Sequence, residues 1–402
     1  MNKQPFLPAI PILNHITAHG FEAYFVGGAV RDYIMNRPIH DIDITTSATP
    51  DEIEAIFKHT IPIGKEHGTI NVVVDGENYE VTTYRTESEY VDHRRPEHVA
   101  FVRNLYEDIL RRDFTMNAIA MDAAFNIVDH FNGQHDIAQQ VIRTVEQPDD
   151  RFEEDALRIL RGIRFYAQLG FTIEQETRAA MKRHIPEIDY LSIERIVTEL
   201  KKLICASHAK KGVALLHSLN AWAYIPYFKQ FNMSLMIVQS AMPFTLFIAI
   251  TEKTQPEINA SLKLLKLSNK EQQAVTTYRK LIDDLPEIKS EKQLKQYVYD
   301  YGVQPICDVL AHSDTLVSNA IEIPTSPILS QAHVTNVAQQ LPIRSRQALA
   351  INGHEVMDVC QRKPGKWLKE TLRALECSVV QGDVSNTQTA LIEWVKKNVK
   401  ND

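Results

Sequence analysis

Two short segments near the amino terminus constrain the fold of this chain most strongly. The first, Phe25–Asp32, has the sequence FVGGAVRD, and the second, His40–Thr46, has the sequence HDIDITT. The first predicts a short apolar strand, a two-glycine turn and the start of a helix, and the second predicts another strand. Because successive side chains of a strand face opposite ways, we expect Asp41 and Asp43 to share one face.

The paired carboxylates and the paired glycines together predict a site for a metal and a nucleotide. Two carboxylates this close repel each other unless a cation lies between them, and two Mg²⁺ ions about 3.5–4 Å apart would satisfy both and drive a phosphoryl displacement. Gly27 and Gly28 let backbone N–H groups approach a phosphate, and Arg31 adds a guanidinium fork. The alternative is a solvent-exposed D-x-D pattern beside an ordinary turn; the glycines and arginine upstream favour the metal-nucleotide site.

The segments that follow predict a small α/β sheet. Thr49–Glu52 (TPDE) has the pattern of a capping box, so a helix should run to about residue 58. Residues 69–74 and 78–83 predict two strands joined by a turn at Asp75-Gly76. Glu80 lies on the second of them, where it is either a third carboxylate facing the metal pair or an exposed strand residue; both interpretations stay open.

A less regular region comes next. Residues 84–108 are charged and lack a clear period, so they predict either a closing or substrate-steering loop or a merely solvated one. Residues 111–120 (RRDFTMNAIA) predict a helix preceded by two arginines. We expect one of Arg111 and Arg112 to reach a triphosphate or a base and the other to pair with Asp113.

Residues 152–165 (FEEDALRILRGIRF) have a helical pattern. Asp155 and Arg158 are three residues apart, so they form either a plain surface ion pair or a carboxylate and a guanidinium displayed toward a base edge. Such a pair matches cytosine and adenine, which offer an amino donor next to ring acceptors, whereas uracil and guanine present a carbonyl. Arg161 and Arg164 continue the ridge, with no matching acids after Asp155, which favours an anion as ligand.

The order of these motifs resembles the tRNA nucleotidyltransferases of the bacterial and eukaryotic class, the CCA-adding enzymes, within the DNA polymerase β-like nucleotidyltransferase superfamily. The similar segments are GGAVRD, DID, RRDFTMNAIAMD, EDALRILRGIRF and SIERIVTELKKL, and they occur in family order over nearly the whole chain. The resemblance also extends to the segment after Thr83, which in the family accompanies the switch from C to A addition. Its length here counts against a CC-only variant.

The resemblance implies roles for individual residues. Asp41 and Asp43 would hold catalytic Mg²⁺, and Gly28 and Arg31 would contact the incoming nucleotide. The remaining nucleotide-pocket residues would be Arg112, Asp155, Arg158, Arg161 and Arg164, with Asp155 and Arg158 acting as an amino-acid template for C and A. Glu194 and Arg195 lie off the apolar stripe of their own predicted helix, so we expect them to brace the template helix.

The predicted fold class is α+β, with a small mixed-sheet nucleotidyltransferase head followed by an all-α neck, body and tail. We expect the catalytic head at 1–146, the neck with the nucleotide-selecting helix at 147–209, the body at 210–322 and a tRNA-binding tail at 323–402. In the body, Ser268–Glu271 (SNKE) predicts a second capping box, before a helix to about residue 284. In the tail, Lys363–Lys366 (KPGK) opens a helix whose N-terminus suits an RNA phosphate, or is simply a capped helix with solvated lysines.

Composition narrows the location and the partners. The four cysteines are scattered, which fits a reducing cytoplasmic compartment and argues against structural zinc. The longest apolar run, near residues 235–250, is interrupted and too short to span a membrane, so it predicts a buried helix. The net charge of −7 argues only weakly against nucleic acid, because binding depends on local patches.

The resemblance to the CCA-adding enzymes implies template-independent addition of C, C and A to the 3′ end of tRNA. The expected partners are CTP, ATP and tRNA, with neither DNA nor a membrane. The alternatives are an enzyme that adds only CC or only A, a poly(A) polymerase of the same superfamily, and a catalytically inactive RNA-binding protein.

Overall fold

The computed structural model describes residues 2–87, 99–323 and 325–399. It divides the chain into two compact units, Met1–Met233 with Ala260–Lys266, and Ser234–Asn259 with Leu267–Asp402. Residues 210–233 therefore pack with the head and neck. The finer division into head, neck, body and tail stays a prediction.

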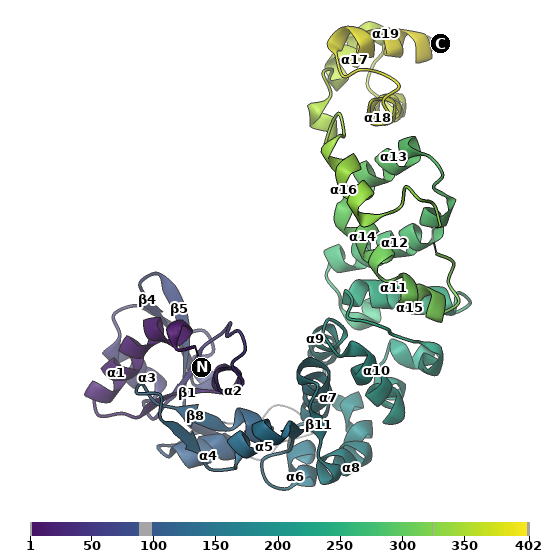
Figure 1. The fold of residues 1–402 in the computed structure, drawn as a ribbon. Helices are drawn as coiled ribbons and strands as arrows, with labels where there is room; N and C mark the ends of the chain where they lie inside the picture. The colour runs from purple at the N-terminus through teal and green to yellow at the C-terminus, as the bar shows by residue number, and fades with distance from the viewer. Residues whose placement is uncertain (1, 88–98, 324, 400–402) are drawn as a thin grey trace. The chain divides into compact units, whose positions relative to one another are not determined.

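Within the described residues, the main sheet of the first unit has seven strands in the spatial order β3-β4-β5-β2-β1-β8-β9. They are β1 (Ala23–Val26), β2 (Asp43–Thr46), β3 (Thr60–Ile61), β4 (Thr69–Val74), β5 (Glu77–Thr83), β8 (Ile119–Met121) and β9 (Ile127–Asp129). Figure 1 labels β1, β4, β5 and β8 of this sheet. The sheet is mixed, since β2 runs parallel to β5 and antiparallel to β1. The α+β class expected from the sequence is confirmed.

Helices pack against this sheet and complete the head. They are α1 (Ile10–Ala18), α2 (Gly28–Ile34), α3 (Pro50–Ile56), α4 (Leu105–Leu110) and α5 (Gly133–Gln139). The predicted capping box of Thr49 and Glu52 opens α3, with both reciprocal hydrogen bonds formed. The turn between β4 and β5 has positive φ at both Asp75 and Gly76, as a tight hairpin requires. Both local predictions are confirmed.

The region after β5 is more ordered than its sequence indicated. Its ends form a two-stranded antiparallel ribbon, β6 (Arg85–Glu87) with β7 (Val99–Phe101), and α4 follows. The middle of the expected closing loop, 88–98, lies outside the described residues. The helix expected at 111–120 is wrong: a 3-10 turn at Thr115–Asn117 leads directly into β8, whose residues are all buried. Burial in the sheet overrode the helical spacing.

Helices make up the rest of the first unit. They are α6 (Pro148–Glu154), α7 (Leu157–Leu169), α8 (Gln175–His184), α9 (Ile193–Ile204) and α10 (Ala209–Ser218), with a short parallel pair of strands, β10 (Val141–Ile142) and β11 (Thr172–Ile173). The continuous helix expected at 152–165 is wrong, because Asp155 has extended backbone angles and separates α6 from α7. The break changes which way the Asp155 side chain faces.

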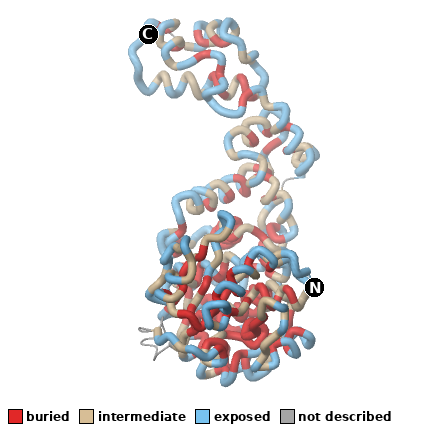
Figure 2. Tube along the Cα trace, turned by 90° about the vertical axis from the view of Figure 1, so that its left-hand side faces the viewer, coloured by how far each residue is buried: buried red, intermediate tan, exposed pale blue. Residues whose placement is uncertain are grey.

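Apolar packing holds these helices together. The predicted stripe of α9 is buried, and α9 packs against α7. Figure 2 shows buried residues gathered densely in the first unit. One polar link ties α6 to α8: the buried His184 ring lies 2.8 Å from Asp149 and 2.7 Å from Glu187. Burial of the ring opposes its protonation, but these two carboxylates raise the pKa of His184 above its usual 6.5.

The second unit is helical throughout its described residues. Its helices are α11 (Phe244–Thr254), α12 (Asn269–Asp284), α13 (Glu291–Tyr301), α14 (Val303–Ala311), α15 (Ser313–Ser318), α16 (Gln331–Gln339), α17 (Gly353–Cys360), α18 (Lys366–Val380) and α19 (Gln388–Asn398). The expected capping box at Ser268 opens α12, and α18 begins at Lys366. In the apolar run near residues 235–250, only the second half is α-helical. Among the described residues, we find no helix with the length and apolar character needed to cross a membrane.

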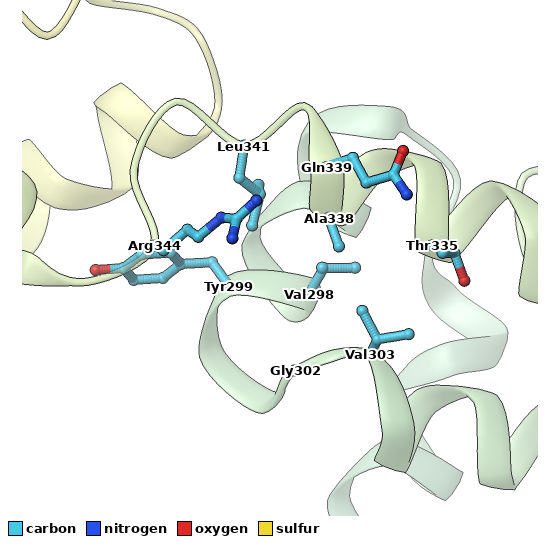
Figure 3. A pocket seen from close by; sticks show the side chains of 9 residues that line it. All are labelled: Val298, Tyr299, Gly302, Val303, Thr335, Ala338, Gln339, Leu341 and Arg344. Atoms are coloured by element: carbon cyan, nitrogen blue, oxygen red, sulfur yellow. The ribbon is translucent and has the colours of Figure 1, made fainter.

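The second unit also contains a cavity of about 430 Å³ that no sequence pattern indicated (Figure 3). Residues of α13, the start of α14, α16 and the following loop line it. Its walls include Val298, Val303, Ala338 and Leu341, and the Tyr299 ring and Arg344 lie beside them. The cavity is therefore mainly apolar.

Candidate active site

The glycine turn and the carboxylates meet because of the strand register. Val26, at the end of β1, pairs with Asp43 at the start of β2, so the turn lies beside the Asp43 carboxylate. Gly27 has φ 69° and ψ −135°, a combination that is essentially restricted to glycine. A Cβ atom at Gly27 would lie 3.8 Å from Asp43 Oδ2 and 3.5 Å from Arg112 Nη1. The turn thus brings backbone, carboxylate and guanidinium together.

Asp41 and Asp43 line one cavity of about 620 Å³, although they do not share a strand. β2 begins at Asp43, so Asp41 lies in the preceding loop, which corrects the alternation expected from the sequence. Glu80 lines the same cavity and is the direct partner of Asp43 across β2 and β5. Of the two interpretations of Glu80, the structure therefore favours a third carboxylate next to Asp43.

The charges around Asp43 favour a cation. Desolvation by the surrounding protein raises the pKa of Asp43, Glu80 and Asp41 raise it further, and Arg112 opposes them. Within the described residues, no set of three or more histidine, cysteine, aspartate or glutamate side chains is arranged to hold a metal ion. The donor set still fits Mg²⁺, because this ion commonly binds through one or two carboxylates and completes its shell with water and substrate phosphates.

Arg31 lies on the other side of the glycine turn. Its guanidinium is buried, pairs with Asp32 at 3.0 Å and donates to Asn117 Oδ1 at 2.7 Å. Its Nη2 atom is 3.6 Å from the position of a Cβ on Gly28, the first residue of α2. Arg31 Nη2 therefore lies beside the first residue of α2, and its expected contact with a nucleotide stays a prediction.

Arg111 and Arg112 do not divide their roles as expected. Both pair with Asp108, Arg111 through Nη2 at 2.8 Å and Arg112 through Nη2 at 3.2 Å. The expected partner of one of them, Asp113, instead pairs with Arg161 at 2.6 Å. Burial opposes ionisation of Asp113, but Arg161, the Asn117 amide and a backbone N–H hold its pKa below the usual range.

Asp155 and Arg158 also take partners that their spacing did not indicate. Asp155 accepts hydrogen bonds from Arg195 Nη2 at 2.6 Å and from the backbone N–H of Leu157 at 3.0 Å. Arg158 pairs with Glu154 and donates to the Arg111 carbonyl at 2.9 Å. Of the two alternatives left by the sequence, the plain ion pair with Arg158 is not the contact that the Asp155 carboxylate makes, because the helix is interrupted at Asp155 between α6 and α7.

The arginine ridge of α7 is balanced by acids from other elements, which corrects the expectation that it lacks them. Arg158 pairs with Glu154, Arg161 with Asp113, and Arg164 with Glu199 at 2.6 Å. The guanidinium groups of Arg31, Arg161 and Arg164 all lie over the Phe165 ring, at 5.3, 5.6 and 3.9 Å from its centroid. Within the first unit the ridge thus packs against acids from α6, from α9 and from the segment before β8, and its charges are oriented but already compensated.

Sequence reasoning expected Arg195 to brace the template helix, and its ion pair with Asp155 confirms a bracing contact. Glu194 pairs with Lys266 instead. Three residues were missed: Asp108, Asn117 and Glu199. Each lies in or beside a recognised motif, but nothing in the spacing of the motifs assigns its partner.

Comparison with known proteins agrees with this geometry. Residues 23–143 match the family model described as "Poly A polymerase head domain", and residues 170–231 match "Probable RNA and SrmB- binding site of polymerase A". Residues 237–395 match "tRNA nucleotidyltransferase domain 2 putative". The CCA-adding enzyme of Staphylococcus saprophyticus is 53% identical over 99% of this chain and 100% of its own length, and that of Staphylococcus haemolyticus is 52% identical over 100% of both.

The chain belongs to the family of CCA-adding enzymes.

A solved structure extends the comparison to three dimensions. The Bacillus stearothermophilus CCA-adding enzyme, crystallised in complex with CTP, is 34% identical, covers 98% of each chain and superimposes with a TM-score of 0.77. The family expected from the motifs is confirmed, and with it the nucleotidyltransferase class. Family membership does not by itself assign roles to the individual residues of the site.

Proposed function

We propose that this chain adds C, C and A in turn to the 3′ end of tRNA, using CTP and ATP, releasing pyrophosphate and needing no nucleic-acid template. The observation that carries the proposal is the 53% identity to a CCA-adding enzyme over the full length of both chains. The CTP complex of the Bacillus stearothermophilus relative supports CTP as one substrate. The carboxylates beside the glycine turn supply the chemistry that the reaction requires.

The catalytic half of the site consists of Asp41 and Asp43 with the glycine turn. Nucleotidyltransferases of this family are metal-dependent, and we infer that the metal is Mg²⁺, held by these two carboxylates. When bound, the metal lowers the pKa of the attacking 3′-hydroxyl and neutralises charge on the triphosphate. Gly28 lets the backbone approach the phosphates. Arg31 and Arg112 offset the negative charge that develops as pyrophosphate leaves.

The selecting half consists of Asp155 and Arg158, with Arg161 and Arg164 completing the nucleotide pocket. A carboxylate accepts about four hydrogen bonds, and Asp155 uses two for Arg195 and Leu157. It therefore keeps capacity to accept from the exocyclic amino group of cytosine or adenine. Arg158 would donate to the ring acceptors, which requires it to share or exchange its contacts with Glu154 and Arg111.

The test uses the purified chain with Mg²⁺ and a tRNA that ends before the CCA sequence. CTP, ATP or both are added, and the products are sized on a gel. Growth by three nucleotides that needs both substrates supports the proposal. Growth by only two nucleotides with both present indicates a CC-adding enzyme, and a long tail from ATP alone indicates a poly(A) polymerase.

A tRNA that already ends in CC separates the remaining alternatives. Extension of this tRNA alone, with no growth of the shorter one, indicates an enzyme that adds only A. No incorporation on either tRNA indicates an RNA-binding protein without activity.

We also infer that the enzyme works in the cytoplasm, since its four cysteines are free in the structure, which suits a reducing compartment.

A further inference from the structure

Asp108 is a buried carboxylate to which the reaction as described above gives no role. Its side chain is fully buried, at 0% exposure, in the first turn of α4. It accepts hydrogen bonds from Arg111 Nη2 at 2.8 Å, Arg112 Nη2 at 3.2 Å and the backbone N–H of Arg85 at 3.3 Å. The hydroxyl of Thr45 lies 3.4 Å from it. Asp108 thus joins β2, the base of the β6–β7 ribbon and the paired arginines.

The two arginines face different ways from this common carboxylate. Arg111 is held through Nε at 3.1 Å as well as Nη2, and its own backbone carbonyl accepts from Arg158. Arg112 uses only Nη2 on Asp108, while its Nη1 lies 3.5 Å from the Cβ position of Gly27. Its buried Nε atom has no hydrogen-bond partner among the described residues. Arg112 therefore points at the glycine turn with donor capacity in reserve.

The charges around Asp108 also support a role in orienting Arg112. Asp108 shares one negative charge between the guanidinium groups of Arg111 and Arg112, so it alone neutralises each of them only in part. Burial opposes ionisation of Asp108, but Arg112 and Arg111 keep its pKa below the usual range. Asp108 therefore stays charged at neutral pH. A fixed anion behind a guanidinium restricts its orientation and leaves its other edge for a second anion.

We propose that Asp108 is a positioning residue that aims Arg112 at the phosphate groups of the incoming nucleotide. The proposal rests on the proposed function of the same site. Because CTP and ATP share the triphosphate, Asp108 acts equally on both nucleotides and takes no part in choosing the base. It is thus distinct from Asp155, whose loss should change the choice of base.

The test is Asp108→Asn, which keeps the size of the side chain and removes its charge. We measure kcat and KM for CTP and ATP, and the dissociation constant of each nucleotide without tRNA. Loss of a charge-assisted contact predicts about a tenfold rise in KM and dissociation constant for both nucleotides, with unchanged discrimination against UTP and GTP. Unchanged nucleotide binding, or a change for only one of the two, would overturn the proposal.

The matched control is Asp136→Asn. Asp136 is another buried carboxylate of the first unit, paired with Arg143 at 3.2 Å and with the Thr115 hydroxyl at 2.6 Å, and it does not line the cavity. We expect Asp136→Asn to lower the unfolding midpoint by about as much as Asp108→Asn does, while the KM for each nucleotide stays unchanged. If both variants raise KM equally, Asp108 acts only through stability and the proposal fails.

A second pair of variants covers the case in which Asp108→Asn does not fold. Arg112 is partly exposed, so Arg112→Gln and Arg112→Lys should fold. Lysine keeps the positive charge but lacks the fork that contacts Asp108 and a phosphate together. We expect the Arg112→Lys variant to bind both nucleotides almost as weakly as the Arg112→Gln variant does. Full binding by the Lys variant would overturn the proposal, because aiming by Asp108 would then be unnecessary.

Nucleotide binding without tRNA separates this inference from the proposed function. If the wild-type chain adds nothing to tRNA, the proposed function fails. The comparison of CTP and ATP binding between wild type and Asp108→Asn still decides whether Asp108 positions Arg112.

Discussion

Replacing Gly27 by alanine should damage both the fold and the reaction, for separable reasons. The φ of 69° and ψ of −135° place Gly27 in a region that other residues occupy at a cost of about 1–3 kcal/mol. The new Cβ would lie 3.5 Å from Arg112 Nη1 and 3.8 Å from Asp43 Oδ2, in the space through which, on the proposed function, a phosphate approaches the backbone. A displacement of about 1 Å in such a site costs about a hundredfold in rate.

Two other glycines separate strain from steric obstruction. Gly20 has φ 88° and nothing within 4 Å of its Cβ position, so Gly20→Ala should cost about 1–2 kcal/mol of stability and leave activity intact. Gly28 has no positive φ and begins α2, so Gly28→Ala should keep stability within about 0.5 kcal/mol. Its Cβ would nevertheless lie 3.6 Å from Arg31 Nη2, where the proposed function places the phosphates, so nucleotide KM should rise.

The assay combines urea unfolding with incorporation kinetics for the three variants. Gly27→Ala should lose stability and should also lose at least about a hundredfold in kcat/KM. Gly20→Ala should lose stability but keep its activity. Gly28→Ala should keep its stability but lose activity. The reasoning is refuted if Gly27→Ala turns over at the wild-type rate, or if Gly20→Ala loses as much activity as Gly27→Ala does.

Three further predictions follow from the same contacts. Asp41→Ala should abolish incorporation of every nucleotide. Chelation of the metal by EDTA should do the same, and added Mg²⁺ should then restore activity to the wild type but not to the variant. Residual incorporation by Asp41→Ala would show that Asp41 is not part of the catalytic half. Asp155→Ala should loosen base choice so that UTP or GTP is accepted, and Arg195→Ala should do so more weakly because Arg195 holds Asp155 at 2.6 Å; unchanged selectivity in both would contradict the template role. The raised pKa of His184 stabilises the fold fully below its unfolded value near 6.5, and this contribution is lost as pH rises through the folded pKa. Urea unfolding should therefore show wild-type stability falling relative to His184→Gln as the pH rises above the unfolded pKa of 6.5 and through the raised folded pKa, and parallel pH profiles would refute this.

Local patterns in the sequence predicted most of the elements that hold the site. The glycine pair, the capping boxes of α3 and α12 and the hairpin turn are correct because each depends on backbone angles and hydrogen bonds within a few residues. The apolar stripe of α9 is correct because its period alone defines a buried face. The helix expected at 111–120 failed because burial in the sheet, which no local pattern records, decided its conformation.

The sequence by itself determined the family, the fold class and the residue types of the site: two carboxylates, a glycine turn and a set of arginines. Only the tertiary structure decided which charge meets which. Arg161 pairs with Asp113, 48 residues away, and Asp155 with Arg195, 40 residues away. Charge attraction has no period along the chain, so spacing cannot assign such partners. Packing of α7 against α9 helps to make that choice, and the pairing of Arg112 with Asp108 leaves Arg112 Nη1 beside the glycine turn.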